Sequence, residues 1–304
     1  MDVSTSAVAL PPRRRQDKVR FQVSSVGWLL PAIALLAVLF IVPVVYAIFL
    51  AFTNLQLLGP HAQSFQFTGT ANLSRMFGDS VFWHSLFLTA IFVVASGIVA
   101  QTVFGFALAL LMQRALPPLR LGIGAIVILA WVLPEISAAF IWYAAGQAGG
   151  AISLLTRSPN TNYLSTSAML IVCIANAWRN TAFSMLVFSA GLRNVPEEVN
   201  EAAQLEGAGY WRRLFSVTIP IMRPTIFTNL LLITLATLSD FTLIFAMTQG
   251  GPGNDTAILP VYSYIEAFQF NELGYGTAIA LALIVLGGLF SLLYVRHLRP
   301  ELNK

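Results

Sequence analysis

The chain has 304 residues, of which 57% are hydrophobic and only 10% are charged. In an average soluble domain about a quarter of residues are charged, so this composition excludes an ordinary soluble enzyme or binding domain and predicts a membrane protein. The formal net charge is +4. Because basic residues also mark the cytoplasmic loops of membrane proteins, this charge needs no nucleic-acid partner to explain it.

Six apolar stretches are long enough to cross a hydrocarbon core of about 30 Å, which takes roughly 20 helical residues. In chain order they are residues 26–52, 82–112, 122–146, 167–190, 225–248 and 275–295. A basic leader precedes the first stretch, as in a secretory signal, but the apolar run is about twice as long as a signal core, which favours a retained helix. The expected fold class is all-α, a polytopic membrane protein with six transmembrane helices.

Basic residues are distributed unevenly between the loops. Fourteen of the 17 lysines and arginines fall on one side of the expected membrane, whereas the other side has Arg75 and Arg157, and Arg179 lies within the fourth span. Positively charged loops stay in the cytoplasm, so both termini and residues 191–224 are expected to face inward. We expect a basic cytoplasmic segment at residues 1–25, an anchor for anionic lipid, followed by one six-helix membrane domain at residues 26–304.

The densest internal charge lies in residues 197–220, EEVNEAAQLEGAGYWRRLFSVTIP. Pro196 suits the first turn of a helix, and the two glutamates that follow favour its positive end. Gly207 and Gly209 predict a break, after which a short amphipathic helix is expected to end at Pro220. Its apolar arc comprises Tyr210, Trp211, Leu214 and Phe215, and its basic side comprises Arg212 and Arg213.

This segment admits two interpretations. A helix lying on the inner leaflet would also have aromatic residues on one face and arginines on the other. An anionic membrane surface would, however, repel the glutamate-rich helix that precedes it. A docking element for a soluble partner fits both halves better, with the aromatic face in a groove and the charges fixing the orientation.

The same residues carry a family resemblance. Glu201, Ala202 and Ala203, then Gly207 four residues on, then Val217 and the pair Ile219-Pro220, have the spacing of the EAA loop. The segment thereby resembles the coupling loop of permease subunits of binding-protein-dependent ABC importers. Residues 178–208, 247–268 and 274–280 are similar to the carbohydrate-uptake branch of that family, which includes permeases for maltose, other oligosaccharides and glycerol phosphate.

The resemblance implies one part of a transporter in the cytoplasmic membrane of a prokaryote. Such importers have a second homologous permease, two cytoplasmic ATPase subunits that use ATP and Mg, and an extracytoplasmic solute-binding protein. In that family the EAA helices dock into a cleft of the ATPase, and closure of the nucleotide dimer changes the permeases from inward-open to outward-open. The residues implied for coupling to the ATPase are Glu201, Ala202, Ala203, Gly207, Tyr210, Trp211, Leu214 and Phe215.

No enzymatic centre, cofactor or metal site is expected in this chain. A nucleotide-binding P-loop needs a glycine-rich turn ending in Lys and Ser or Thr, and the two lysines, Lys18 and Lys304, lie in no such turn. The three histidines are isolated, without partners at metal spacing. Cys173, the single cysteine, lies in an apolar span and is interpreted as a packing residue. ATP hydrolysis is therefore expected on separate subunits.

Three ionisable residues lie inside expected spans: Glu135, Arg179 and Asp240. A charge at mid-membrane costs at least ~2.5 kcal/mol on insertion scales, so each should face a cavity, an interface or a partner. Arg179 and Asp240 are expected at similar depth, where they either form a structural ion pair or line a solute path. Further candidates for contact with a sugar are Asn176, Asn180, Gln101, Asn229, Trp178, Tyr143 and Phe241.

The sequence thus predicts a permease subunit that imports a sugar or related solute by alternating access, with ATP used by partner subunits. The alternative is an ion-coupled secondary transporter or channel that acts without ATPase subunits. That alternative needs a relay of buried carboxylates, for which Glu135 and Asp240 are the candidates. A membrane scaffold that uses residues 191–224 only for docking is a third possibility.

Overall fold

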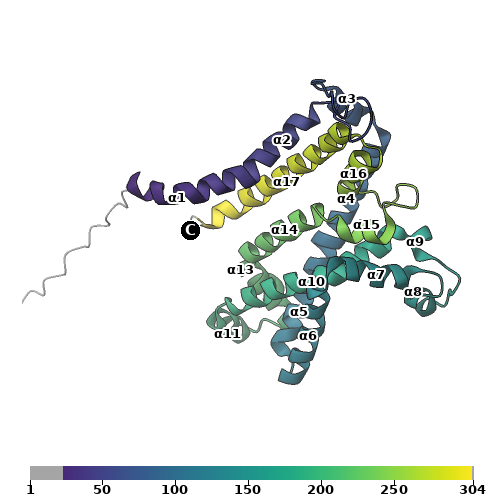
Figure 1. Ribbon diagram of the computed structural model, residues 1–304. Helices are drawn as coiled ribbons and strands as arrows, with labels where there is room; N and C mark the ends of the chain where they lie inside the picture. The colour runs from purple at the N-terminus through teal and green to yellow at the C-terminus, as the bar shows by residue number, and fades with distance from the viewer. Residues whose placement is uncertain (1–22, 303–304) are drawn as a thin grey trace, which may run out of the picture. The chain divides into compact units, whose positions relative to one another are not determined.

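The computed structural model describes residues 23–302, which form helices joined by loops (Figure 1). Within this range there is no β-sheet, only an isolated bridge between Thr53 and Phe67. Residue contacts divide the chain into two units, Met1–Tyr46 and Ala47–Lys304. The basic residues of the expected N-terminal segment, 1–25, and Lys304 lie outside the described residues.

The first unit contains α1 (Val23–Leu36), the wide π-turn η1 (Ala37–Ile41) and the start of α2 (Val42–Ala51). Residues Leu29–Ala51 are long and apolar enough to cross a membrane, with a mean hydropathy of 3.0. The wide turn ends two residues before Pro43 in the chain. Because a proline ring collides with the carbonyl four residues earlier, such a turn lets the helix continue through the proline.

The second unit holds the remaining elements. They are α3 (Ala71–Gly78), α4 (Ser80–Phe92), η2 (Val93–Gln101), α5 (Thr102–Arg114), α6 (Pro117–Val132), α7 (Glu135–Gly146), α8 (Ala151–Leu155), α9 (Tyr163–Thr166), α10 (Ala168–Arg193), α11 (Glu197–Leu205), α12 (Tyr210–Arg213), η3 (Leu214–Thr218), α13 (Ile219–Ile221), α14 (Arg223–Leu238), α15 (Thr242–Thr248), α16 (Leu259–Tyr264), η4 (Ile265–Gln269) and α17 (Leu273–Leu302). The all-α prediction is confirmed for the described residues.

Two of the six expected spans are not continuous helices. The third, predicted at 122–146, bends by 102° between α6 and α7, because Pro134 forces Leu133 out of the helical conformation. The fifth, predicted at 225–248, ends at Leu238 and resumes at Thr242. Among residues 23–302, four helices are long and apolar enough to span alone, and the number rises to six if each of two bent helix pairs is one span.

Helix α10 is the centre of the second unit, where it packs against α5, α6, α7, α14 and α15 (Figure 1). Gly105 of α5 permits a close approach of α5 to α10: a Cβ atom there would lie 2.4 Å from Cβ of Ser184 on α10. Small residues of this kind are typical of packed membrane helices. Cys173 is buried in the core cluster on α10, which agrees with its interpretation as a packing residue.

A polar cluster ties α3 and α4 to α16 and α17. Asp79 caps α4 by accepting a hydrogen bond from the Val81 amide (2.8 Å). Its carboxylate also accepts hydrogen bonds from the hydroxyls of Tyr262 and Tyr275. Burial disfavours the charged carboxylate, but these hydrogen bonds outweigh it and hold the pKa of Asp79 below its ordinary value. Arg75 forms ion pairs with two neighbouring glutamates of the same cluster.

Candidate functional site

The first candidate site is the charged loop between α10 and α14. Helix α11 follows Pro196, as predicted, and has two glutamates in its first turn. It ends before Gly207, whose φ of +77° lies in the left-handed region that favours glycine. None of its residues is buried, and Leu205 is 90% exposed. Within the described chain, α11 therefore presents its surface for a partner.

The helical run after the glycine break is longer than predicted. It continues through Pro220 to Ile221, and the chain then turns by 70° into α14. The prediction that Pro220 ends the helix is wrong by one residue. The wide turn η3 precedes Pro220, as η1 precedes Pro43, and this accommodates the ring inside the run.

The predicted apolar arc of this second piece divides into two parts. Leu214 is buried at 5% exposure, and the ring of Tyr210 lies 3.9 Å from the guanidinium carbon of Arg114 on α5. Trp211 and Phe215 stack on each other at 6.2 Å and are 67% and 63% exposed. Two of the four residues therefore hold the loop to the body of the protein, and the other two face outward.

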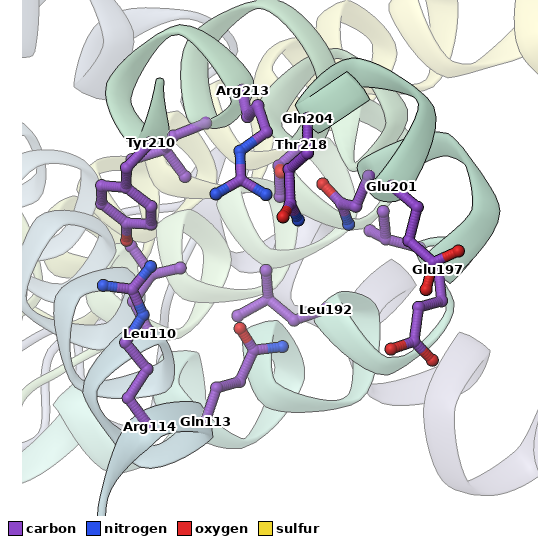
Figure 2. Close-up of a pocket in the computed structure, with 13 residues that line it drawn as sticks. Leu110, Gln113, Arg114, Leu192, Glu197, Glu201, Gln204, Tyr210, Arg213 and Thr218 are labelled. Carbon is purple, nitrogen blue, oxygen red and sulfur yellow. The ribbon is translucent and has the colours of Figure 1, made fainter. Parts of the chain in front are cut away.

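A polar cavity of about 560 Å³ lies between the loop and the ends of α5 and α10 (Figure 2). Its lining residues are Leu110, Gln113, Arg114, Leu192, Val195, Glu197, Asn200, Glu201, Gln204, Tyr210, Arg213, Leu214 and Thr218. Arg114 and Tyr210 lie on one side and Glu197 on the opposite side, while Arg213 reaches into the space between them (Figure 2). No local sequence pattern predicts this cavity, because α5 and the loop are far apart in the chain.

The second candidate site joins the two helix breaks. Glu135 is the first residue of α7, directly after the 102° bend, and Asp240 lies in the break between α14 and α15. Arg179 of α10 forms an ion pair with Glu135 at 3.9 Å. Asp240 is an electrostatic neighbour of both, but no ion pair joins it to Arg179 in the described part of the chain. The start of α7 therefore supplies Arg179 with its ion-pair partner, Glu135.

Hydrogen bonds extend this cluster along α10. Arg179 donates to Oδ1 of Asn180 (3.2 Å), and Asn180 donates to Oδ1 of Asn176 (2.6 Å). Asn176 in turn donates to Oγ of Ser96 (2.7 Å), a residue that sequence reasoning missed. Oδ1 of Asp240 and Nε of Arg179 are buried without a hydrogen-bond partner. Two buried polar atoms in the cluster thus lack a hydrogen-bond partner among the described residues.

The other predicted sugar-contact residues do not gather at one place. Trp178 packs edge-on against Trp142, Phe241 stacks with Phe245, and Tyr143 lines a separate cavity of about 230 Å³. The two remaining residues, Gln101 and Asn229, are buried, and Asn229 donates to Ser184. No group of three or more potential metal ligands is found among residues 23–302.

Comparison with known proteins identifies the family. Residues 101–304 match the family model of the binding-protein-dependent transport system inner membrane component. The chain is 30% identical to the sulfoquinovosyl glycerol transport system permease protein of Agrobacterium fabrum, over 90% of this chain and 89% of the relative. It is also 30% identical to the trehalose/maltose transport system permease protein of Thermococcus litoralis, over 92% and 96%.

A solved structure agrees on the fold. A chain of the bacterial alginate ABC transporter, crystallised with its pentasaccharide-bound periplasmic protein, has a TM-score of 0.74 over 89% of this chain and 92% of that one, at 19% identity. None of these matches favours a transporter that works without ATPase subunits. Taken with the helical fold and the exposed loop, they show that this chain belongs to the inner membrane components of binding-protein-dependent transport systems, the permease subunits of ABC importers.

Proposed function

We propose that this permease carries a sugar or a related polyhydroxylated solute into a prokaryotic cell. Its partners are a second permease, two cytoplasmic ATPase subunits that hydrolyse ATP with Mg, and an extracytoplasmic binding protein. The relatives support the solute class, since they are named for trehalose and maltose, sulfoquinovosyl glycerol, and diacetylchitobiose. The placement of basic residues supports six spans in the cytoplasmic membrane with both termini inside.

Coupling to the ATPase is assigned to the loop at residues 191–224. Helix α11 docks on the ATPase through Glu201, Ala202 and Ala203, of which Glu201 also lines the cavity, and Gly207 supplies the turn behind it. The observation that supports this is that a nine-residue helix buries none of its side chains in the described chain. A surface helix of a folded protein normally buries one apolar stripe, so α11 lacks a partner that a second protein would supply.

Motion reaches the membrane through the second half of the loop. Tyr210 and Leu214 hold α12 and η3 to the body of the protein. Trp211 and Phe215 belong to the same connection between the loop and the membrane helices. A displacement of α11 is transmitted through the 70° bend into α14, which ends next to Asp240. The polar cavity beside α11 leaves about 560 Å³ into which the helix can move.

The cluster at the two helix breaks is assigned to the solute path. The hydroxyl groups of a sugar both donate and accept hydrogen bonds, and Arg179 and Asp240 each offer a buried polar atom without a partner. Glu135, Asn176 and Asn180 complete the site. The Glu135 and Arg179 side chains are 30% and 19% exposed, so their ion pair can be reached from the path when the breaks move.

Reconstitution tests the function. The purified permeases are placed in vesicles with and without the ATPase subunits, and uptake of radiolabelled trehalose, maltose and diacetylchitobiose is measured with the binding protein present. ATP-dependent uptake of one of these sugars is expected only in the complete assembly. Uptake at the same rate without ATPase subunits would instead support the ion-coupled alternative.

A further inference from the structure

The polar cavity behind the coupling loop continues into an apolar groove. The groove has a volume of about 450 Å³ and runs beside α5, α10, η3 and α14. Leu110 and Leu214 line both spaces, so the two are adjacent. The groove is walled by apolar residues of membrane helices, including Phe106 and Phe188, and by the exposed pair Trp211 and Phe215. Together they form one amphipathic site.

The polar end of this site holds two arginines without an anionic partner. Neither Arg114 nor Arg213 makes an ion pair or side-chain hydrogen bond among residues 23–302, and Nε of Arg213 is buried without an acceptor. Arg114 is fixed in place by the Tyr210 ring. A buried donor that has no acceptor is costly, so an anion placed between the two guanidinium groups would satisfy it.

The carboxylates of the same cavity come from α11 on its other side. Glu197 lies across the cavity from Arg114 and Tyr210 (Figure 2). Glu201 also lines the cavity but forms no ion pair with either arginine in the described chain. The positive side of the cavity is therefore formed by α5 and α12, both of which also border the apolar groove.

We propose that this double site binds one anionic phospholipid of the cytoplasmic leaflet. Its phosphate lies between Arg114 and Arg213, and an acyl chain lies in the groove against Trp211 and Phe215. A free phosphate would use only the polar half, whereas the adjacent groove matches a ligand with an apolar tail. In membrane proteins generally, tryptophan is enriched at the membrane interface and arginine lies beside anionic lipid headgroups, as proposed here for Trp211 and the two arginines. This inference goes beyond the proposed function, because it concerns neither the solute nor the ATPase.

The lipid would lie between the coupling loop and α5, which is part of the second expected span. It would hold α12 against α5 while leaving α11 exposed. Both interpretations of residues 197–220 then apply, each to one half: the glutamate-rich helix docks on a soluble partner, and the aromatic half contacts lipid.

Fluorescence quenching tests the proposal on the complete transporter in detergent. Brominated phosphatidylglycerol or brominated phosphatidylcholine is titrated in, and the Trp211 signal is isolated by subtracting the signal of a Trp211→Phe transporter. Saturable quenching is expected with the anionic lipid, at a half-saturation about tenfold below that of the zwitterionic lipid. The preference is expected to disappear in Arg114→Gln/Arg213→Gln. It is expected to persist in Arg212→Gln, which changes a neighbouring arginine outside the cavity.

Several results would overturn the proposal. Equal half-saturation for the two lipids would mean that the arginines do not select the anionic headgroup. An unchanged preference in Arg114→Gln/Arg213→Gln would mean the same. No quenching of Trp211 by either lipid would mean that another protein chain covers the groove. Displacement of the lipid by an equal concentration of soluble glycerol phosphate would mean that the groove contributes nothing. The Arg114→Lys/Arg213→Lys variant retains both charges and is expected to keep a preference, which controls for misfolding.

Discussion

The contact between α5 and α10 gives a sharp prediction for Gly105→Ala. A Cβ atom at this position would lie 2.4 Å from Cβ of Ser184 and 3.0 Å from the backbone nitrogen of Met185. Carbon atoms pack at about 3.5–4.0 Å, so the two helices must separate by about 1 Å or more. Overpacking of this kind costs about 1–3 kcal/mol, and we expect Gly105→Ala to lower the free energy of unfolding by that amount.

The matched control is Gly122→Ala in α6, where a new Cβ atom would meet nothing within 4 Å. Alanine favours a helix over glycine by about 1 kcal/mol, so this variant is expected to be neutral or stabilising. Both variants are unfolded in mixed micelles of increasing denaturing detergent and followed by circular dichroism. Adding Ser184→Gly to Gly105→Ala is expected to restore part of the loss. Equal stability of the two alanine variants would refute the close approach of α5 and α10.

Three further predictions concern coupling, the solute path and pH. Glu201→Lys is expected to leave membrane insertion intact but to reduce the ratio of solute uptake to ATP hydrolysis at least tenfold. The control Glu206→Lys, just beyond α11, is expected to keep the normal ratio. Uptake and ATPase assays on the same vesicles measure both rates. Glu135→Gln removes the ion pair at the helix break and is expected to change the KM for solute more than the yield of folded protein, while an unchanged KM would favour a purely structural pair. Because the pKa of Asp79 is lowered in the folded state, its stabilisation is complete above its ordinary pKa of about 3.9 and is lost as pH falls toward the lowered value. Tyr275→Phe, which removes one of its hydrogen bonds, is therefore expected to cost about 1 kcal/mol of unfolding free energy near neutral pH and progressively less in acid; a cost independent of pH would contradict this.

The helices and their approximate positions follow from hydropathy, because apolar stretches of about 20 residues have few alternatives in a bilayer. The breaks do not. Pro134 is visible in the sequence, but prolines are tolerated inside membrane helices, as Pro31 is inside α1. The interruption at Ser239–Phe241 has neither proline nor glycine to mark it. Its position depends on tertiary contacts that a local pattern does not contain.

The candidate sites divide in the same way. The glycine break and the start of α11 directly after Pro196 were predictable, since both rest on local backbone preferences. The partner of Arg179 was not, because Glu135 reaches it only through the bend between α6 and α7. The position of Arg114 over Tyr210 joins residues far apart in the chain. A helical projection places Tyr210, Trp211, Leu214 and Phe215 on one apolar face, but the contact with Arg114 separates Tyr210 from the exposed residues of that face.

Cross-linking tests the central claim, that α11 docks on the ATPase, most directly. Leu205→Cys places a thiol on the exposed face of α11, and the native Cys173 is buried, so the maleimide end of a short maleimide–diazirine reagent should react at the introduced site, and its photoactivated diazirine end then inserts into whatever protein lies beside it. The control is Leu116→Cys, which is 71% exposed in the loop before α6. We expect a cross-link from residue 205 to the ATPase subunit, with a yield that changes when ATP is added, and little from residue 116. No cross-link from residue 205 in an actively transporting complex, or equal cross-links from both positions, would contradict the account.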